Sequence, residues 1–164
     1  MFAAIRTLAV GLALGTVPAA HAQAPLLSAH EAVERSIASP GAPLPEAWIE
    51  MNVCGAGADG ARGYLNSKEN YRDRGSLNIE LVPPVRAAIA ARLGGDPIEV
   101  LYGERIRVYG AARQVRISVF RRSDGVTVGS YFQTQLRLSS ADRLEVVERS
   151  ADLSDGDACG PLAV

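Results

Sequence analysis

The residues best suited to hold a ligand lie in one polar stretch, residues 66–74. Within it, Tyr71, Arg72 and Arg74 place a phenol ring beside two guanidinium groups. Such a ring can stack on bases or sugars, and the arginines can contact anionic groups. The stretch therefore predicts a loop that can bind an anionic polymer.

The same stretch also has a purely structural interpretation. In that interpretation Asn66 and Asp73 cap backbone turns, Tyr71 packs at the rim of the fold, and the arginines pair with Glu69 and Asp73. No repeated aromatic and basic pattern accompanies the stretch, which favours the structural interpretation. Both interpretations remain open at this level.

Residues outside the stretch extend the candidate ligand face. They come from segments before and after it in which apolar and polar residues alternate. The complete set of candidate ligand-binding residues is Tyr64, Asn66, Tyr71, Arg72, Arg74, Arg107, Tyr109 and Arg116.

No arrangement of residues typical of catalysis, a metal site or a cofactor site is recognisable. His30 is the single histidine after residue 22, and no G-x-S-x-G motif accompanies it. Gly55–Gly60 matches G-x-G-x-x-G, but no helix follows to face a phosphate, so we interpret it as a hairpin loop. Asp155 and Asp157 are interpreted as a solvated turn. We expect a non-catalytic protein without metal or cofactor.

Two further functional classes stay open beside a binding module for single-stranded nucleic acid or another polyanion. One is a metal-dependent nuclease, in which Asp59, Glu69 and Asp73 supply carboxylates and Arg72 or Arg74 stabilises phosphate charge. The spacing of these residues matches no known motif. The other is an accessory that binds a protein of the cell envelope.

Two segments show helical patterns. Ser28 and Glu31 form a capping box that predicts a short helix from about Ala29 to Ala38. Pro83-Pro84 begins a second helix that ends at Gly94-Gly95.

The remaining segments alternate between apolar and polar residues, as half-buried strands do. The predicted strands are 49–53, 63–66, 77–81, 106–119, 126–138 and 144–147. Within 106–119 the apolar positions change from even to odd numbers, which predicts a bulge or glycine bend near Gly110–Ala112. Ser123-Asp124-Gly125 is predicted to turn the chain back.

The resulting order is a helix, three strands, a helix, two long strands and a short tail strand. This order predicts a mainly β protein, a five-stranded OB-type barrel with a short N-terminal helix. Its strand blocks resemble those of bacterial exported OB-fold, nucleic-acid-binding-like domains over residues 46–147. The blocks that carry the resemblance are Trp48–Val53, Tyr64–Ser67, Tyr71–Asp73, Leu77–Leu81, Gly103–Gly110 and Gln135–Val146. The resemblance implies a fold that binds nucleic acids, oligosaccharides, small cations or other proteins.

The chain divides into a leader, one domain and a tail. We expect a signal peptide at 1–22, a helix and linker at 23–45, the barrel at 46–149 and a tail at 150–164. Its 164 residues suffice for one core, and no apolar run is long enough to cross a bilayer. Seven arginines against Glu104 and Asp124 give residues 101–137 a net charge of +5. A solvated basic face accounts for that excess at least as well as a polyanion groove.

The cysteine pair agrees with export. Cys54 and Cys159 are the two cysteines of the chain, and we expect them to form a disulfide in the periplasm or outside the cell. The bond would hold the tail against the first predicted strand.

Export makes a direct prediction about the N-terminus. Arg6, the apolar run 7–17 and the small residues Ala20 and Ala22 form the three regions of a signal peptide. We expect cleavage after Ala22, so that intact mass spectrometry of the protein purified from a periplasmic extract gives a chain that begins at Gln23. Recovery of the chain from the cytoplasm with residues 1–22 attached would contradict export.

Overall fold

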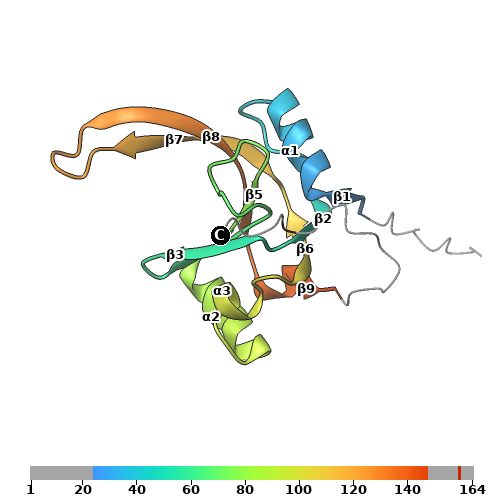
Figure 1. Cartoon of the computed structure of the whole chain (residues 1–164). Coiled ribbons are helices and arrows are strands. Elements are labelled where there is room, and N and C mark those ends of the chain that lie inside the picture. The colour runs from blue at the N-terminus through green and yellow to red at the C-terminus, as the bar shows by residue number, and fades with distance from the viewer. Residues whose placement is uncertain (1–23, 148–158, 160–164) are drawn as a thin grey trace, which may run out of the picture.

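The computed structural model describes residues 24–147 and Cys159 (Figure 1). The described part is mainly β. In chain order the elements are β1 Leu26–Ser28, α1 Ala29–Ala38, β2 Ala47–Asn52, β3 Gly55–Asp59, β4 Arg62–Asn66, β5 Leu77–Leu81, α2 Pro83–Leu93, α3 Pro97–Val100, β6 Arg105–Gly110, β7 Arg113–Phe120, β8 Thr127–Leu138, the 3-10 turn Ala141–Arg143 and β9 Leu144–Val146.

The strands form two mixed sheets. Sheet A has the order β1-β2-β6-β9 and sheet B the order β3-β4-β5-β8-β7. The β1–β2 and β5–β8 pairs are parallel, and the other pairs are antiparallel. The long β7–β8 hairpin extends away from the rest of the molecule (Figure 1).

Two chain segments pass from one sheet to the other. At the first, β2 leaves β6 and β3 joins β4, and there the amide of Val53 bonds to Glu104 O at 2.9 Å while that of Cys54 bonds to Asn66 O at 2.9 Å. At the second, Ala111 and Ala112 separate β6, paired with β2, from β7, paired with β8. The bend predicted near Gly110–Ala112 is therefore confirmed.

Packing at the second bend favours glycine. A Cβ at Gly110 would lie 3.2 Å from the side chain of Leu136, a fully buried residue of β8. After the bend, half-buried Val115, Ile117 and Val119 share one side of β7. Because Arg113 pairs with Gln135 and the next residue, Leu136, faces the core, these three side chains lie on the side of sheet B that faces away from the core. The bend is present, but it does not return the apolar positions of β7 to the core.

The helices cover opposite ends of the sheets in Figure 1. The capping box of α1 is confirmed, since Glu31 N donates to Ser28 Oγ at 3.2 Å and Ser28 N donates to Glu31 Oε2 at 2.8 Å. The predicted second helix is also confirmed, and it ends at Gly94 with a φ of 77°. Arg86 of α2 pairs with Asp96, which caps α3. None of the helices described is long and apolar enough to cross a bilayer.

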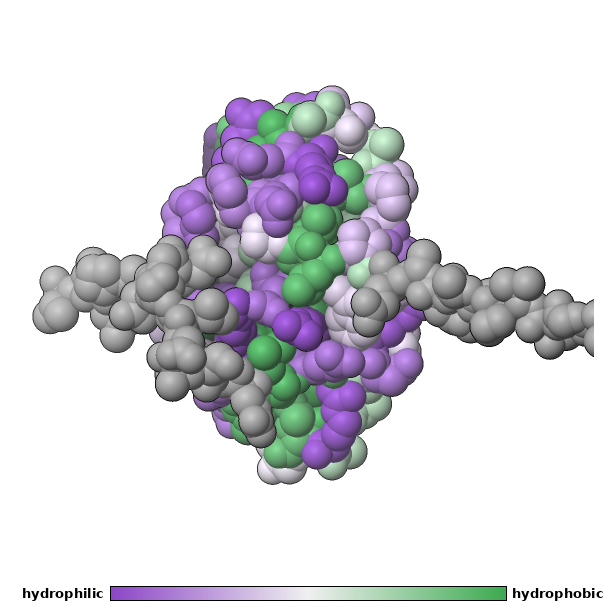
Figure 2. Space-filling view, turned by 90° about the vertical axis from the view of Figure 1, so that its right-hand side faces the viewer, coloured by the Kyte–Doolittle hydropathy of each residue, from purple (hydrophilic) through white to green (hydrophobic). Residues whose placement is uncertain are grey.

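The core lies between the sheets and the helices. Its largest fully buried side chains are Val33, Ile49, Leu65, Leu77, Ile79, Leu81, Ile89, Leu101, Ile106, Leu136, Leu138 and Leu144. They come from α1, α2 and both sheets, so one apolar core joins all these elements. On the side of the molecule shown in Figure 2, apolar surface is confined to a narrow band between hydrophilic regions.

One predicted element is wrong. Residues 55–59 of the presumed hairpin loop Gly55–Gly60 form strand β3, and the turn occupies only Gly60 and Ala61. Glycine suits this strand because a Cβ at Gly55 would lie 2.8 Å from the carbonyl oxygen of Lys68. Strand β1 and helix α3 were not predicted, since neither is longer than four residues.

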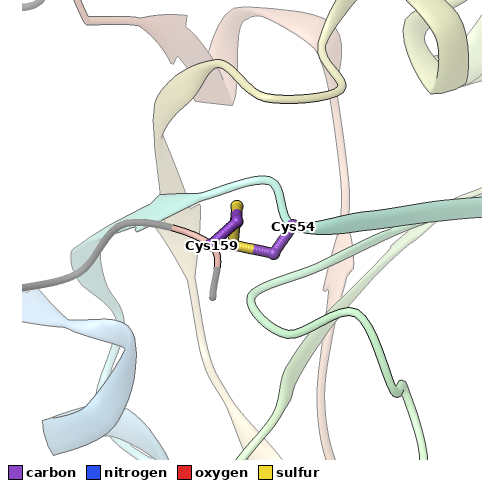
Figure 3. Close-up of a disulfide and its surroundings, with 2 residues drawn as sticks. All are labelled: Cys54 and Cys159. Carbon is purple, nitrogen blue, oxygen red and sulfur yellow. A yellow bond between two sulfur atoms is a disulfide. The ribbon is translucent and has the colours of Figure 1, made fainter. Parts of the chain in front are cut away.

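The predicted disulfide is present between Cys54 and Cys159 (Figure 3). Cys54 is buried between β2 and β3, where the chain changes sheets. The bond therefore ties position 159 to the first of the two bends.

Loss of the disulfide should destabilise the fold. The cysteines are 105 positions apart, and closing so long a loop restricts the unfolded chain by about 2–5 kcal/mol of folding free energy. We expect Cys159→Ser to lower the free energy of unfolding in urea by this amount. Reductant should lower the stability of the wild type equally and leave that of a Cys54→Ser/Cys159→Ser chain unchanged. Identical unfolding midpoints for the oxidised and reduced wild type would refute the prediction.

Candidate functional site

Sheet B carries a row of polar side chains on the side opposite the core. Leu65, Ile79 and Leu136 of neighbouring strands are buried and paired in register, so their sequence neighbours face the other way. One outward row joins Tyr64, Glu80 and Arg137, and the next joins Asn66, Asn78, Gln135 and Arg113. We call these residues, together with Arg62, the polar face of sheet B. Asn66, Asn78 and Glu80 are buried, so a ligand could reach only Tyr64, Gln135 and the three arginines of this face.

A clamped carboxylate lies in the first row. Glu80 is buried and accepts from Arg137 Nε at 2.8 Å, and Arg62 Nε lies 3.7 Å from its other oxygen. The hydrogen bond that Arg137 donates to Glu80 raises the pKa of Arg137, so this guanidinium remains charged. Two arginines around one carboxylate leave a net positive charge here.

The polar face continues onto the first part of the β7–β8 hairpin. Gln135 Nε2 donates to Gln133 Oε1 at 2.9 Å, and Gln133 Nε2 donates to the carbonyl oxygen of Tyr71 at 2.9 Å. This chain of bonds attaches the loop 67–76 to strand β8. It brings Tyr71 next to the polar face.

Three side chains stack where the loop meets β8. The Arg72 guanidinium carbon lies 5.2 Å from the ring centre of Tyr71 and 5.8 Å from that of Tyr131. The interaction with the Tyr131 side chain, followed by that with Tyr71, raises the pKa of Arg72. A permanent cation between two rings can bind an anion and offers flat surfaces for stacking.

The loop is held in place by its own polar groups. Asp73 Oδ1 accepts from Gly75 N at 2.7 Å, and its other oxygen lies 3.3 Å from Lys68 Nζ. Asn70 Oδ1 accepts from Arg72 N at 3.0 Å, and Ser67 Oγ accepts from Leu77 N at 2.9 Å. The structural role expected for Asp73 is confirmed, whereas Arg72 stacks on tyrosines and pairs with neither Glu69 nor Asp73 in the bonds described.

The structure unites only part of the predicted ligand face. Tyr64 and Asn66 lie on the polar face, Tyr71 and Arg72 lie beside it, and Arg74 is exposed in the same loop. Arg116 projects from the opposite side of the hairpin to Tyr131 and donates to Ser130 Oγ at 2.9 Å.

Arg107 and Tyr109 belong to sheet A. Arg107 pairs with Glu50 at 2.6 Å, and the Tyr109 ring lies 5.3 Å from that of Trp48. They were grouped with Tyr71 because a sequence does not reveal which sheet a strand joins. They are not part of the polar face of sheet B.

A small cavity beside these residues is less suited to a ligand. It has a volume of about 240 Å³, and its lining includes Leu26, Glu50 and Arg105. Burial would raise the pKa of Glu50, but hydrogen bonds from Arg107 and Arg105 outweigh it and lower that pKa. The one carboxylate that lines the cavity is thus already paired with two arginines.

The carboxylates of the nuclease hypothesis do not gather into a metal site. Within residues 24–147 and Cys159, no three histidine, cysteine or acidic side chains lie close enough to hold an ion. Asp59 ends β3, and Asp73 is engaged within its own loop. Asp155 and Asp157 lie outside the described residues.

Sequence reasoning missed Tyr131, Gln133 and Arg137. They alternate along β8 in the sequence, which identified the strand but not its neighbours. Their role depends on the parallel pairing of β8 with β5. This pairing places Tyr131 and Gln133 beside a loop about 60 residues earlier and Arg137 beside Glu80.

Comparisons with known proteins add little. No protein family and no curated protein matches the chain. Among solved structures, it is similar to a protein of Leishmania major Friedlin assigned as an aspartyl-tRNA synthetase, with a TM-score of 0.43 and 10% identity. The likeness covers 87% of this chain and 24% of that one. At this level it carries no weight for fold or function.

The anchoring of the loop can be tested by pH. The hydrogen bond from Gly75 and the charge of Lys68 lower the pKa of Asp73, so its ionised form stabilises the folded state above the unfolded pKa of about 3.9. We expect Asp73→Asn to lower the free energy of unfolding at pH 7. The difference should disappear as the pH falls through the lowered folded pKa. Glu69→Gln removes a charge from the same loop and serves as the control; an Asp73→Asn effect independent of pH would exclude this role of the charge.

Proposed function

We propose that this chain is an exported, non-catalytic binding module of OB type that holds single-stranded nucleic acid or a similar polyanion on the polar face of sheet B. The observation that carries the proposal is the stack of Arg72 on Tyr71 and Tyr131 beside a row of arginines. Stacking surfaces next to a positive track are the features that bind single strands without sequence preference.

The strand pairing supports the OB-type fold. If β2 with β3 counts as one bent strand and β6 with β7 as another, the sheets combine into five strands paired in the order 1-2-3-5-4-1. The third and fifth strands are parallel, and a helix lies between the third and fourth. OB barrels bind polymers on the face of their second and third strands, which here are β4 and β5.

Charge supports the choice of an anionic ligand. The polar face and the stack contain four arginines and one carboxylate, a net charge of +3. These residues are Arg62, Arg72, Arg113, Arg137 and Glu80. The whole chain has a net charge of −1, so positive charge is concentrated at this face. The signal-like leader and the disulfide support export to an oxidising compartment.

Binding of an oligothymidylate labelled with a fluorophore tests the proposal. If about three phosphates are contacted, the logarithm of the association constant should fall with the logarithm of salt concentration with a slope of about −2. Arg72→Ala should reduce the slope by about 0.7, and Tyr131→Ala should weaken binding about 5- to 100-fold.

Arg35→Ala is the matched control, because Arg35 is exposed on α1 and its removal changes the net charge equally. Anisotropy titrations at several salt concentrations measure all three variants. The proposal fails if the wild type does not bind at low salt, or if Arg72→Ala and Tyr131→Ala bind as Arg35→Ala does.

A further inference from the structure

The end of the β7–β8 hairpin is a ribbon of two strands with no third strand beside it. β5 pairs with β8 only from Thr134 onward, whereas β7 and β8 pair with each other as far as Phe120 and Thr127. All residues from 121 to 130 are exposed, and the hairpin curves away from the body (Figure 1). An isolated two-stranded ribbon gains little stability from its own pairing. Large apolar side chains that such a ribbon exposes to water often mark a site of interaction with a partner.

Large apolar side chains are exposed at the end of this ribbon. The exposed fractions are 60% for Phe120, 52% for Val126 and 51% for Val128, whereas Phe132, 50% exposed, lies at the other end of the ribbon, next to the body. Phe120 and Val126 immediately flank the turn 121–125, and Val128 is the extra residue of a bulge. We call Phe120, Val126 and Val128 the apolar tip.

The turn that carries the apolar tip has a defined shape. Arg121 N donates to Val126 O at 2.8 Å, and Asp124 accepts from Val126 N at 3.0 Å and from Arg121 Nη1 at 2.9 Å. Gly125 has a φ of 69°, which glycine adopts without strain. The apolar side chains are therefore presented on a preformed hairpin end.

The ribbon is also strongly basic. Residues 113–133 include Arg113, Arg116, Arg121 and Arg122 against the single acid Asp124, a net charge of +3. The partner that complements this ribbon must accept apolar side chains at one projecting end and carry negative charge around them.

We propose that the apolar tip inserts into the surface of an anionic phospholipid membrane, with the arginines of the ribbon on the lipid phosphates. Valine and phenylalanine side chains gain free energy when they leave water for the boundary of the acyl chains, and arginines nearby are attracted to anionic headgroups. Valines have neither a ring to stack on bases nor hydrogen-bonding groups, so a nucleic acid would leave Val126 and Val128 unused. Apart from Arg113, which lies where the ribbon joins the polar face, this inference uses residues outside that face, and its test does not depend on the function proposed above.

Vesicle sedimentation tests the proposal with the protein expressed with its own N-terminus and purified oxidised. We expect binding to vesicles of phosphatidylcholine with phosphatidylglycerol, and much weaker binding to phosphatidylcholine alone. Phe120→Ser with Val126→Ser should weaken binding about tenfold or more, and Arg122→Gln about fivefold. Tyr102→Ser is the matched control, because Tyr102 is 50% exposed in the segment between α3 and β6.

A second readout locates the inserted residue. Tryptophan fluorescence of Phe120→Trp should be quenched by brominated lipids, and that of Tyr102→Trp should not. Absence of vesicle binding, or equal binding by the tip and control variants, overturns the proposal. It is also overturned if the tip variants lose oligonucleotide binding instead, or if they dissociate a dimer seen in sedimentation velocity. All tip positions are exposed, so the variants should unfold at the same urea concentration as the wild type.

Discussion

The fold depends on one constraint, namely that each of two chain segments contributes one strand to sheet A and the next strand to sheet B. Residues 47–59 and 105–120 change partners midway, at Val53-Cys54 and at Ala111-Ala112. At each bend the backbone comes close to neighbouring chain segments, so the packing there is tight. Gly110 packs against Leu136 at one bend, and the buried disulfide of Cys54 holds the other.

The two sheets carry similar charged groups that differ in exposure. Each sheet has a glutamate between two arginines: Glu50 with Arg105 and Arg107 in sheet A, and Glu80 with Arg62 and Arg137 in sheet B. In sheet A the arginines are partly buried and the group lies beside a small cavity. In sheet B both arginines are more than half exposed and lie on the same face as Tyr64. Burial thus makes the first group structural, while exposure leaves positive charge available on the second.

The hairpin has two sections that suit different partners. Near the body, Gln133 and Tyr131 bind and stack on the loop 67–76, so this section helps to build the polar face. Beyond it, no third strand covers the ribbon, and the apolar tip lies at the far end. Taken together, the two proposals make the hairpin the link between a polymer held on sheet B and a membrane.

The sequence alone determined the local elements of this protein. The capping box at Ser28, the prolines before α2 and the glycine after it act through neighbouring residues, so both helices were predicted with their observed bounds. The sequence also placed the bend at Gly110–Ala112, but not the side of β7 that faces the core. Only the tertiary structure decided that residues 55–59 form a strand, that Arg107 and Tyr109 belong to sheet A, and that Tyr131 meets Arg72. The last two depend on contacts between segments about 60 residues apart, and the free energy of such pairings comes from shared burial that no single segment encodes. Strand β3 pairs with its sequence neighbour β4, but its glycines and alanines carry little strand propensity.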